Sequence, residues 1–94
     1  MQFDWDPIKA ERNHQKHGIT FEEATTVFSD PCAIIIADPG HSHGEERFAA
    51  VGLSKWYRIL VVVFVERIQD QIRIISARPA TSHERKLYET STYR

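Results

Sequence analysis

The sequence has little cysteine and no long hydrophobic run. Its 94 residues include a single cysteine, Cys32, so no disulfide can form within the chain. The longest apolar run, 59–65, is far shorter than the roughly 20 residues of a transmembrane helix. The first six residues lack the basic and then apolar pattern of a signal peptide. We therefore expect a cytoplasmic protein that makes no membrane contact.

Several motifs of large enzyme classes are also missing. The sequence contains no P-loop, no dinucleotide-binding fingerprint, no nucleophile elbow and no paired cysteine ligands. Cys32 follows Pro31, and such a cysteine is more typical of a packed small residue than of a nucleophile. These observations give no reason to expect a cofactor, and we predict none.

The formal net charge of −1 conceals an asymmetry between the two halves of the chain. Residues 1–46 hold 3 Lys/Arg and 9 Asp/Glu, whereas residues 47–94 hold 9 Lys/Arg and 4 Asp/Glu. A basic half can form a surface for a polyanion, but the two halves of a small protein can also intermix in space. The length and the 41% hydrophobic content predict one globular domain over 1–94.

Three segments carry the signals that begin and end helices. The Asp-Pro pair at 6–7 supplies an N-cap and a first-turn proline, so the sequence predicts a helix over 7–17 that Gly18 ends. Capping boxes over 20–23 and 81–84 predict two further helices. The side chains that helical spacing turns toward a core are Phe21, Ala24, Val27, Phe28, Leu87 and Tyr88.

Apolar and β-branched runs predict four strands, which cover 33–37, 47–53, 57–66 and 72–77. The third strand is apolar on both faces, which favours a central position, and Pro79 ends the sheet. Short connections indicate neighbouring antiparallel strands in a meander. We therefore expect an α+β fold with two N-terminal helices, a four-stranded antiparallel sheet and one C-terminal helix. We expect the helices on one sheet face and the other face open.

The most promising side chains for chemistry lie at the ends of predicted elements. Arg78 ends a strand, where a fixed guanidinium can clamp a phosphate, although an ion pair with Glu84 or Glu46 is equally compatible. Glu46 and Arg47 begin another strand. His17 places an imidazole at a helix C-terminus, where simple capping is the alternative.

A metal site is a weaker possibility. His41, His43 and Glu45 would point to one side of an extended loop, as metal ligands do. Two histidines at this spacing are a weak signal, and an exposed polar hairpin loop explains them equally well. We therefore predict no metal, and sensitivity to a chelator would argue for the alternative.

Several motifs taken together resemble the BrnT family within the wider RelE-like group. The resemblance runs from Phe3 to Tyr88, and any one motif alone would be weak. The sequence departs from the family over 55–58, where members often carry a glycine turn before the arginine. The motifs are Trp5-Asp6-Pro7 with Lys9-Ala10, Lys16-His17-Gly18-Ile19, and Arg73-Ile74-Ile75-Ser76-Ala77-Arg78.

The resemblance implies a RelE-like fold and the ribonuclease toxin of a type II toxin–antitoxin system, which inhibits translation and growth. It also implies neutralisation by a BrnA-like antitoxin, which binds DNA through a ribbon-helix-helix dimer. The toxin would then reach operator DNA only through the antitoxin.

Cleavage of RNA without a metal uses the substrate's own 2′-hydroxyl as the nucleophile, so a base, a phosphate clamp and an acid are needed. Glu46 or His17 is a candidate base, and Arg47 and Arg78 are candidate phosphate ligands. The candidate acids are His17, His83 and Tyr88. The candidate RNA-binding residues are Lys9, Asn13, Lys16, Arg73 and His83.

Two rival interpretations fit the same residues. A non-catalytic module that binds RNA or a protein partner would carry the same polar helix and basic half. A degenerate toxin that retains only its antitoxin-binding surface would leave cell growth unaffected on induction. An activity assay on purified protein separates both from a ribonuclease.

Overall fold

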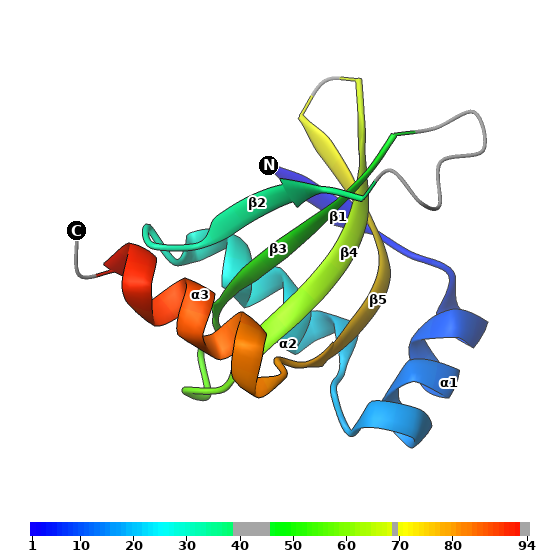
Figure 1. Ribbon diagram of the computed structural model, residues 1–94. Coiled ribbons are helices and arrows are strands. Elements are labelled where there is room, and N and C mark those ends of the chain that lie inside the picture. Colours follow the sequence, from blue (N-terminus) through cyan, green and yellow to red (C-terminus); the bar gives the residue numbers. More distant parts are fainter. Residues whose placement is uncertain (39–45, 69, 93–94) are drawn as a thin grey trace.

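The computed structural model describes residues 1–38, 46–68 and 70–92, which are built around one mixed five-stranded sheet (Figure 1). The strands lie in the order β1-β5-β4-β3-β2. Their bounds are β1 Gln2–Asp4, β2 Ile34–Ala37, β3 Arg47–Leu53, β4 Ile59–Arg67 and β5 Gln71–Pro79.

The sequence predicted a four-stranded antiparallel sheet, but the sheet has a fifth strand. Strands β2 to β5 form the expected antiparallel meander. β1 then pairs with β5 in parallel, with Asp4 opposite Arg73. A three-residue strand is too short to show an alternating pattern, and its partner lies almost 70 residues along the chain. The sequence therefore gives no local signal for this pairing.

The three predicted helices are present with the predicted caps. They are α1 Pro7–His17, α2 Phe21–Thr26, which continues as a short 3-10 turn over Val27–Ser29, and α3 Ser82–Thr92. Asp6 accepts a hydrogen bond from the Ile8 N–H at 2.8 Å, and Thr20 accepts one from the Glu23 N–H at 3.1 Å. Gly18 ends α1 in the left-handed conformation, with φ 71°. None of the helices in the described part of the chain is long and apolar enough to cross a membrane.

The helices do not all lie on one face of the sheet, as the sequence had led us to expect. α2 packs on the face that carries Leu60, Val62 and Phe64 of β4. α3 packs on the opposite face, where Tyr88 contacts Val51 and Val61, and Figure 1 shows α3 in front of the sheet and α2 behind it. Both faces of β4 are apolar, so each face needs a cover, and the cover on the α3 side is partial.

Leu87 was also expected to face the core, but it is only partly covered and lines a cavity between α3 and the sheet. Tyr88 is 8% exposed, whereas Leu87 is 42% exposed. Successive residues of a helix differ by about 100° in direction, so only one of the two neighbours can face a flat sheet squarely. The aromatic ring takes that position.

α1 closes the edge of the sheet beside the second half of β5 (Figure 1). The Asn13 amide takes the place of a neighbouring strand there. Its Oδ1 accepts a hydrogen bond from the Ala77 N–H at 3.0 Å, and its Nδ2 donates to the Ala77 carbonyl at 2.8 Å. Nδ2 also donates to the Ile19 carbonyl at 3.0 Å. One buried side chain thus satisfies three backbone groups and fixes α1 against β5.

Candidate nucleic-acid interface

The sheet face that α3 covers only in part carries arginine side chains at both ends of an apolar floor. Directly opposite residues of neighbouring strands share a face. Arg47, Val65 and Arg73 are opposite one another on β3, β4 and β5, and Arg78 is opposite Val61. Val61 and Val65 are four residues apart on one strand, which is about 13 Å. Both valines are only 4% exposed, so the arginines, rather than the apolar floor between them, are what this face offers to a nucleic acid.

Arg78 is held by Glu84 from the first turn of α3. Its Nη1 and Nη2 donate to the two carboxylate oxygens at 2.7 and 2.8 Å, and Nη1 also donates to the Pro79 carbonyl at 3.3 Å. Glu84 is itself fixed, because its Oε1 accepts from the Thr81 N–H at 2.9 Å. The ion pair with Glu84 is therefore present. It does not exclude a phosphate ligand for Arg78, because it holds the guanidinium in one orientation.

The Glu84 contact uses only one edge of the guanidinium. The contacts found among the described residues occupy both hydrogens of Nη1 and one of Nη2. The Nε hydrogen and the second Nη2 hydrogen form the other edge, and that two-pronged edge matches the geometry of a phosphate. The side chain is 38% exposed, so the edge is within reach of a ligand.

The charges of this pair are fixed across the neutral range. Hydrogen bonds from Arg78 lower the pKa of Glu84 to about 2, against a smaller opposing effect of burial. The hydrogen bond to Glu84 raises the pKa of Arg78 above its ordinary value. Arg78 is thus a permanent cation and Glu84 a very weak base, so neither can transfer a proton in catalysis near neutral pH.

A cavity of about 320 Å³ lies between α3 and the sheet, and His83 and Arg78 are both among the residues that line it. Its floor is formed by apolar side chains of β2, β3 and β4. An imidazole can accept and donate a proton near neutral pH, so His83 brings acid–base chemistry to the same cavity as the phosphate-binding edge of Arg78. The other lining residues are Ile36, Ala37, Asp38, Ala49, Val51, Val61, Val63, Glu84 and Leu87.

A second group of basic side chains borders the same sheet face along α1. Lys9, Arg12 and Lys16 follow helical spacing and line a cavity of about 220 Å³ between α1 and β5, together with His17. Ser76 also lines this cavity, and it is opposite Val63 on the partly covered face. Arg12 was missed as a binding residue, although its spacing of three from Lys9 is a signal that the sequence contains.

Comparison with known proteins identifies a family for this chain. The sequence profile described as "Ribonuclease toxin, BrnT, of type II toxin-antitoxin system" matches residues 5–84. The chain belongs to the BrnT family. The crystal structure of the Brucella abortus ribonuclease toxin BrnT is similar, with a TM-score of 0.66 and 25% sequence identity, over 87% of this chain and 99% of that one. A comparison with curated proteins gives no match. Neither match names the wider RelE-like group, so that part of the expectation stays a prediction.

Two residues proposed for RNA contact or catalysis in this BrnT family member have structural roles instead. Asn13 is 8% exposed, and its amide is engaged with backbone groups. The Tyr88 hydroxyl donates to Asp30 Oδ2 at 2.6 Å beneath α3. Burial alone would raise the pKa of Asp30, but hydrogen bonds from Leu53, Tyr88 and Cys32 lower it overall. We therefore remove Asn13 from the RNA-binding set and Tyr88 from the candidate acids.

The remaining predicted residues fall in different places. Arg73 lies on the partly covered sheet face and forms an ion pair with Asp4, with Nη1 3.1 Å from Oδ2. Glu46 is exposed directly before β3. Cys32 is exposed, which corrects its interpretation as a packed residue.

His41, His43 and Glu45 lie outside the described residues. Within the described ranges, no group of three or more His, Cys, Asp or Glu side chains is arranged to hold a metal ion.

Proposed function

We propose that this chain is an endoribonuclease toxin that cuts RNA by attack of the substrate's own 2′-hydroxyl, without a metal ion. The observation that carries the proposal is the Arg78 guanidinium, which Glu84 fixes at the cavity that His83 also lines. Preorganised charge at the reacting phosphate is the main requirement of this reaction, because the transition state carries extra negative charge on the phosphate oxygens.

Each step of the reaction needs one group. A base removes the 2′-hydroxyl proton, the 2′-oxygen forms a bond to phosphorus, and the bond from phosphorus to the 5′-oxygen breaks as an acid protonates that oxygen. Arg78 binds the reacting phosphate, and Arg47 and Arg73 bind the strand farther along the sheet. His83 is our first choice for proton transfer because it lines the same cavity as Arg78.

Glu46 and His17 remain the other candidates for proton transfer. Glu46 directly precedes Arg47 at the start of β3, and His17 belongs to the basic surface of α1. Lys9, Arg12 and Lys16 would attract and position the RNA backbone on that side.

We further propose that the toxin acts in the cytoplasm, where cleavage of RNA inhibits translation and growth. A cognate BrnA-like antitoxin of the ribbon-helix-helix type would neutralise it, and operator DNA would be contacted only through that antitoxin. The type II description of the family supports an antitoxin partner.

The test is cleavage of RNA and of matched DNA by purified, antitoxin-free protein, with and without a chelator. We expect RNA to be cut equally in both buffers and DNA to stay intact, because DNA lacks the 2′-hydroxyl. Arg78→Ala should lower the cleavage rate at least tenfold, as loss of a positioned charge typically costs a few kcal/mol. Arg78→Lys should not restore it, because an ammonium has no two-pronged edge.

Arg85→Ala is the matched control, since Arg85 is an exposed arginine on α3, next to Glu84, that does not line the cavity. Full activity of a folded Arg78→Ala protein would remove Arg78 from the site. Cleavage that stops with chelator would favour a metal site at His41, His43 and Glu45. Binding of RNA without cleavage would favour the non-catalytic module.

A further inference from the structure

The hairpin between β3 and β4 displays two aromatic side chains to solvent. Trp56 is 56% exposed and Tyr57 is 85% exposed. Tyr57 also has a left-handed backbone conformation, with φ 64°, which is uncommon and unfavourable for a bulky residue. The fold buries neither ring, and of the two only Trp56 lines a cavity found among the described residues.

The hairpin backbone is held rigidly. The Ser54 N–H donates to the Arg58 carbonyl at 2.8 Å, and the Tyr57 N–H donates to the Ser54 carbonyl at 2.9 Å. The Ser54 hydroxyl oxygen accepts from the Trp56 N–H at 3.2 Å. These bonds fix the turn, so Trp56 is presented by a rigid backbone.

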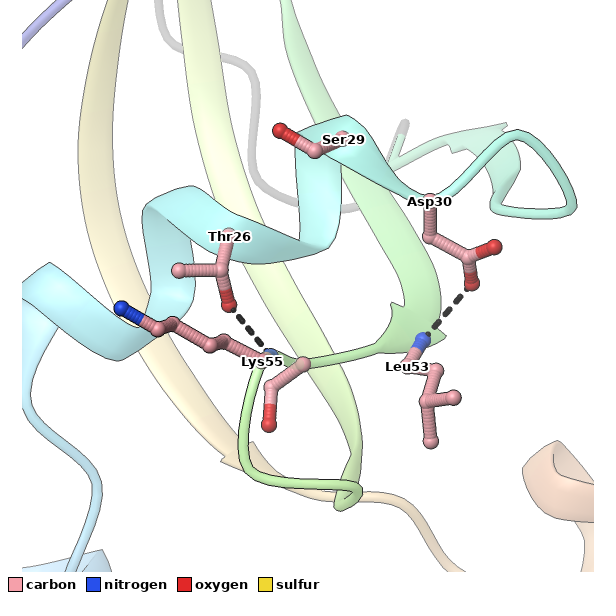
Figure 2. Close-up of a pocket in the computed structure, with 6 residues that line it drawn as sticks. Thr26, Ser29, Asp30, Leu53 and Lys55 are labelled. Atoms are coloured by element: carbon pink, nitrogen blue, oxygen red, sulfur yellow. Dashed lines mark hydrogen bonds between the residues drawn. The ribbon is translucent and has the colours of Figure 1, made fainter.

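α2 and the residues after it hold the base of the hairpin (Figure 2). Thr26 Oγ1 accepts from the Lys55 N–H and Asp30 Oδ2 accepts from the Leu53 N–H, each at 2.8 Å. These residues line a cavity of about 370 Å³. Because its Thr26 and Asp30 oxygens already bind the backbone, we assign that cavity a structural role.

A buried carboxylate fixes the cation of the hairpin. Glu23 is 2% exposed, and its Oε2 accepts from the Ser54 hydroxyl at 2.7 Å and from Arg58 Nε at 2.9 Å. Arg58 Nη2 binds the other oxygen, Oε1. The hydrogen bonds from Arg58 lower the pKa of Glu23 despite its burial. The Arg58 side chain is nonetheless 48% exposed, so one part of a fixed guanidinium faces solvent.

Trp56 and Arg58 both line a cavity of about 410 Å³ between the hairpin and the end of α1. The Lys55 ammonium lies 5.6 Å from the centre of the Trp56 ring. Apart from Trp56, every residue that lines the cavity is polar, charged or glycine: His14, Gly18, Thr20, Glu23 and Arg58. An aromatic ring and a guanidinium plane among cations are the groups on which unpaired bases stack. The polar lining favours a nucleic acid over a protein partner, because the buried centre of a protein interface is mostly apolar.

This cavity lies at the same end of the sheet as Arg78. Arg58 directly precedes β4. The beginning of β4 pairs with the end of β5, where Leu60 is opposite Pro79, the residue after Arg78. Arg58 and Val61, the partner of Arg78, are three residues apart, which is about 10 Å along a strand. The Arg58 side chain points to the α2 side of the sheet, where it binds Glu23, whereas Arg78 lies on the α3 side with Val61. An RNA strand that reaches both Arg78 and Trp56 therefore passes around this end of the sheet.

We propose that Trp56 is a stacking platform for one unpaired base of the RNA substrate, a few nucleotides from the phosphate bound by Arg78. Arg58 and Lys55 contact the phosphate backbone of the RNA next to that base. The inference rests on the proposed ribonuclease function for its substrate, and it makes the enzyme selective for single-stranded RNA.

The test measures binding of the full chain to a short single-stranded RNA that carries 2′-O-methyl groups throughout. Such RNA cannot be cut by 2′-hydroxyl attack, so binding is measured independently of cleavage. We expect Trp56→Ala to weaken binding about 5- to 100-fold and Trp56→Phe to keep most of it, as loss of one stacked base predicts. Tyr57→Asn is the control, because Tyr57 belongs to the same hairpin but does not line the cavity, and it should bind normally.

Fluorescence gives a second readout. In a Trp5→Phe background, Trp56 is the only tryptophan, and its emission should be quenched by single-stranded RNA and much less by the matching duplex. Unchanged affinity of Trp56→Ala, or no quenching, would overturn the proposal. Normal RNA binding by Trp56→Ala together with lost inhibition by the antitoxin would also overturn it and assign the hairpin to the antitoxin. Stacking without cleavage of ordinary RNA would keep the platform and refute only the ribonuclease proposal.

Discussion

Replacing Glu84 by glutamine should destabilise the protein in a way that depends on pH. The pKa of Glu84 falls from 4.5 to about 2 on folding, chiefly through its hydrogen bonds with Arg78. Such a change corresponds to at most about 3 kcal/mol of stability at neutral pH. Arg78 is 38% exposed, so solvent screens the pair, and we expect a loss of about 1–2 kcal/mol. For a domain of this size the melting temperature should fall by about 5–15 °C.

The sign of the pH dependence follows from the lowered pKa. The stabilisation by ionised Glu84 is fully present above pH 4.5 and is lost as the pH falls through about 2. Urea unfolding of wild type and Glu84→Gln between pH 7 and pH 3 measures it. The difference in unfolding free energy should shrink by about half or more by pH 3.

Glu89→Gln is the matched control, because Glu89 is exposed on the same helix and no ion pair to it is found among the described residues. Its effect should stay below about 0.5 kcal/mol at every pH. A Glu84→Gln deficit that is the same at pH 7 and pH 3 would refute the ion-pair explanation and leave only lost packing or capping.

Three further changes test separate parts of the structure. Asn13→Ala should lower the unfolding free energy by about 3 kcal/mol, because it leaves buried backbone groups of Ala77 without partners; a loss below about 1 kcal/mol in urea unfolding would contradict that role. Tyr88→Phe should cost about 1 kcal/mol through the lost bond to Asp30 and leave the cleavage rate within about twofold, whereas a large rate loss would return Tyr88 to the site. Lys16→Ala should reduce the slope of log affinity for single-stranded RNA against log salt by about 0.7, and an unchanged slope would remove Lys16 from the phosphate contacts.

Local signals in the sequence were sufficient for the helices and the meander. Asp6, Thr20 and Gly18 act on backbone groups within four residues, so their effect is readable without any tertiary contact. The same holds for Arg78 and Glu84, which are six residues apart and meet at a strand-to-helix turn. The family was likewise identifiable, because its motifs are short and combine over nearly the whole chain.

Contacts between distant residues were decided only by the tertiary structure. The sequence suggested that Asn13 is an exposed residue of a polar helix. Its amide instead forms hydrogen bonds with Ala77, 64 residues away, at a sheet edge that no local sequence pattern predicts. The parallel pairing of β1 with β5 and the position of α3 on the far sheet face arise from the same kind of long-range contact. They also determine which arginines share a face, so the sequence supplied the charged residues and the topology decided which of them form one surface.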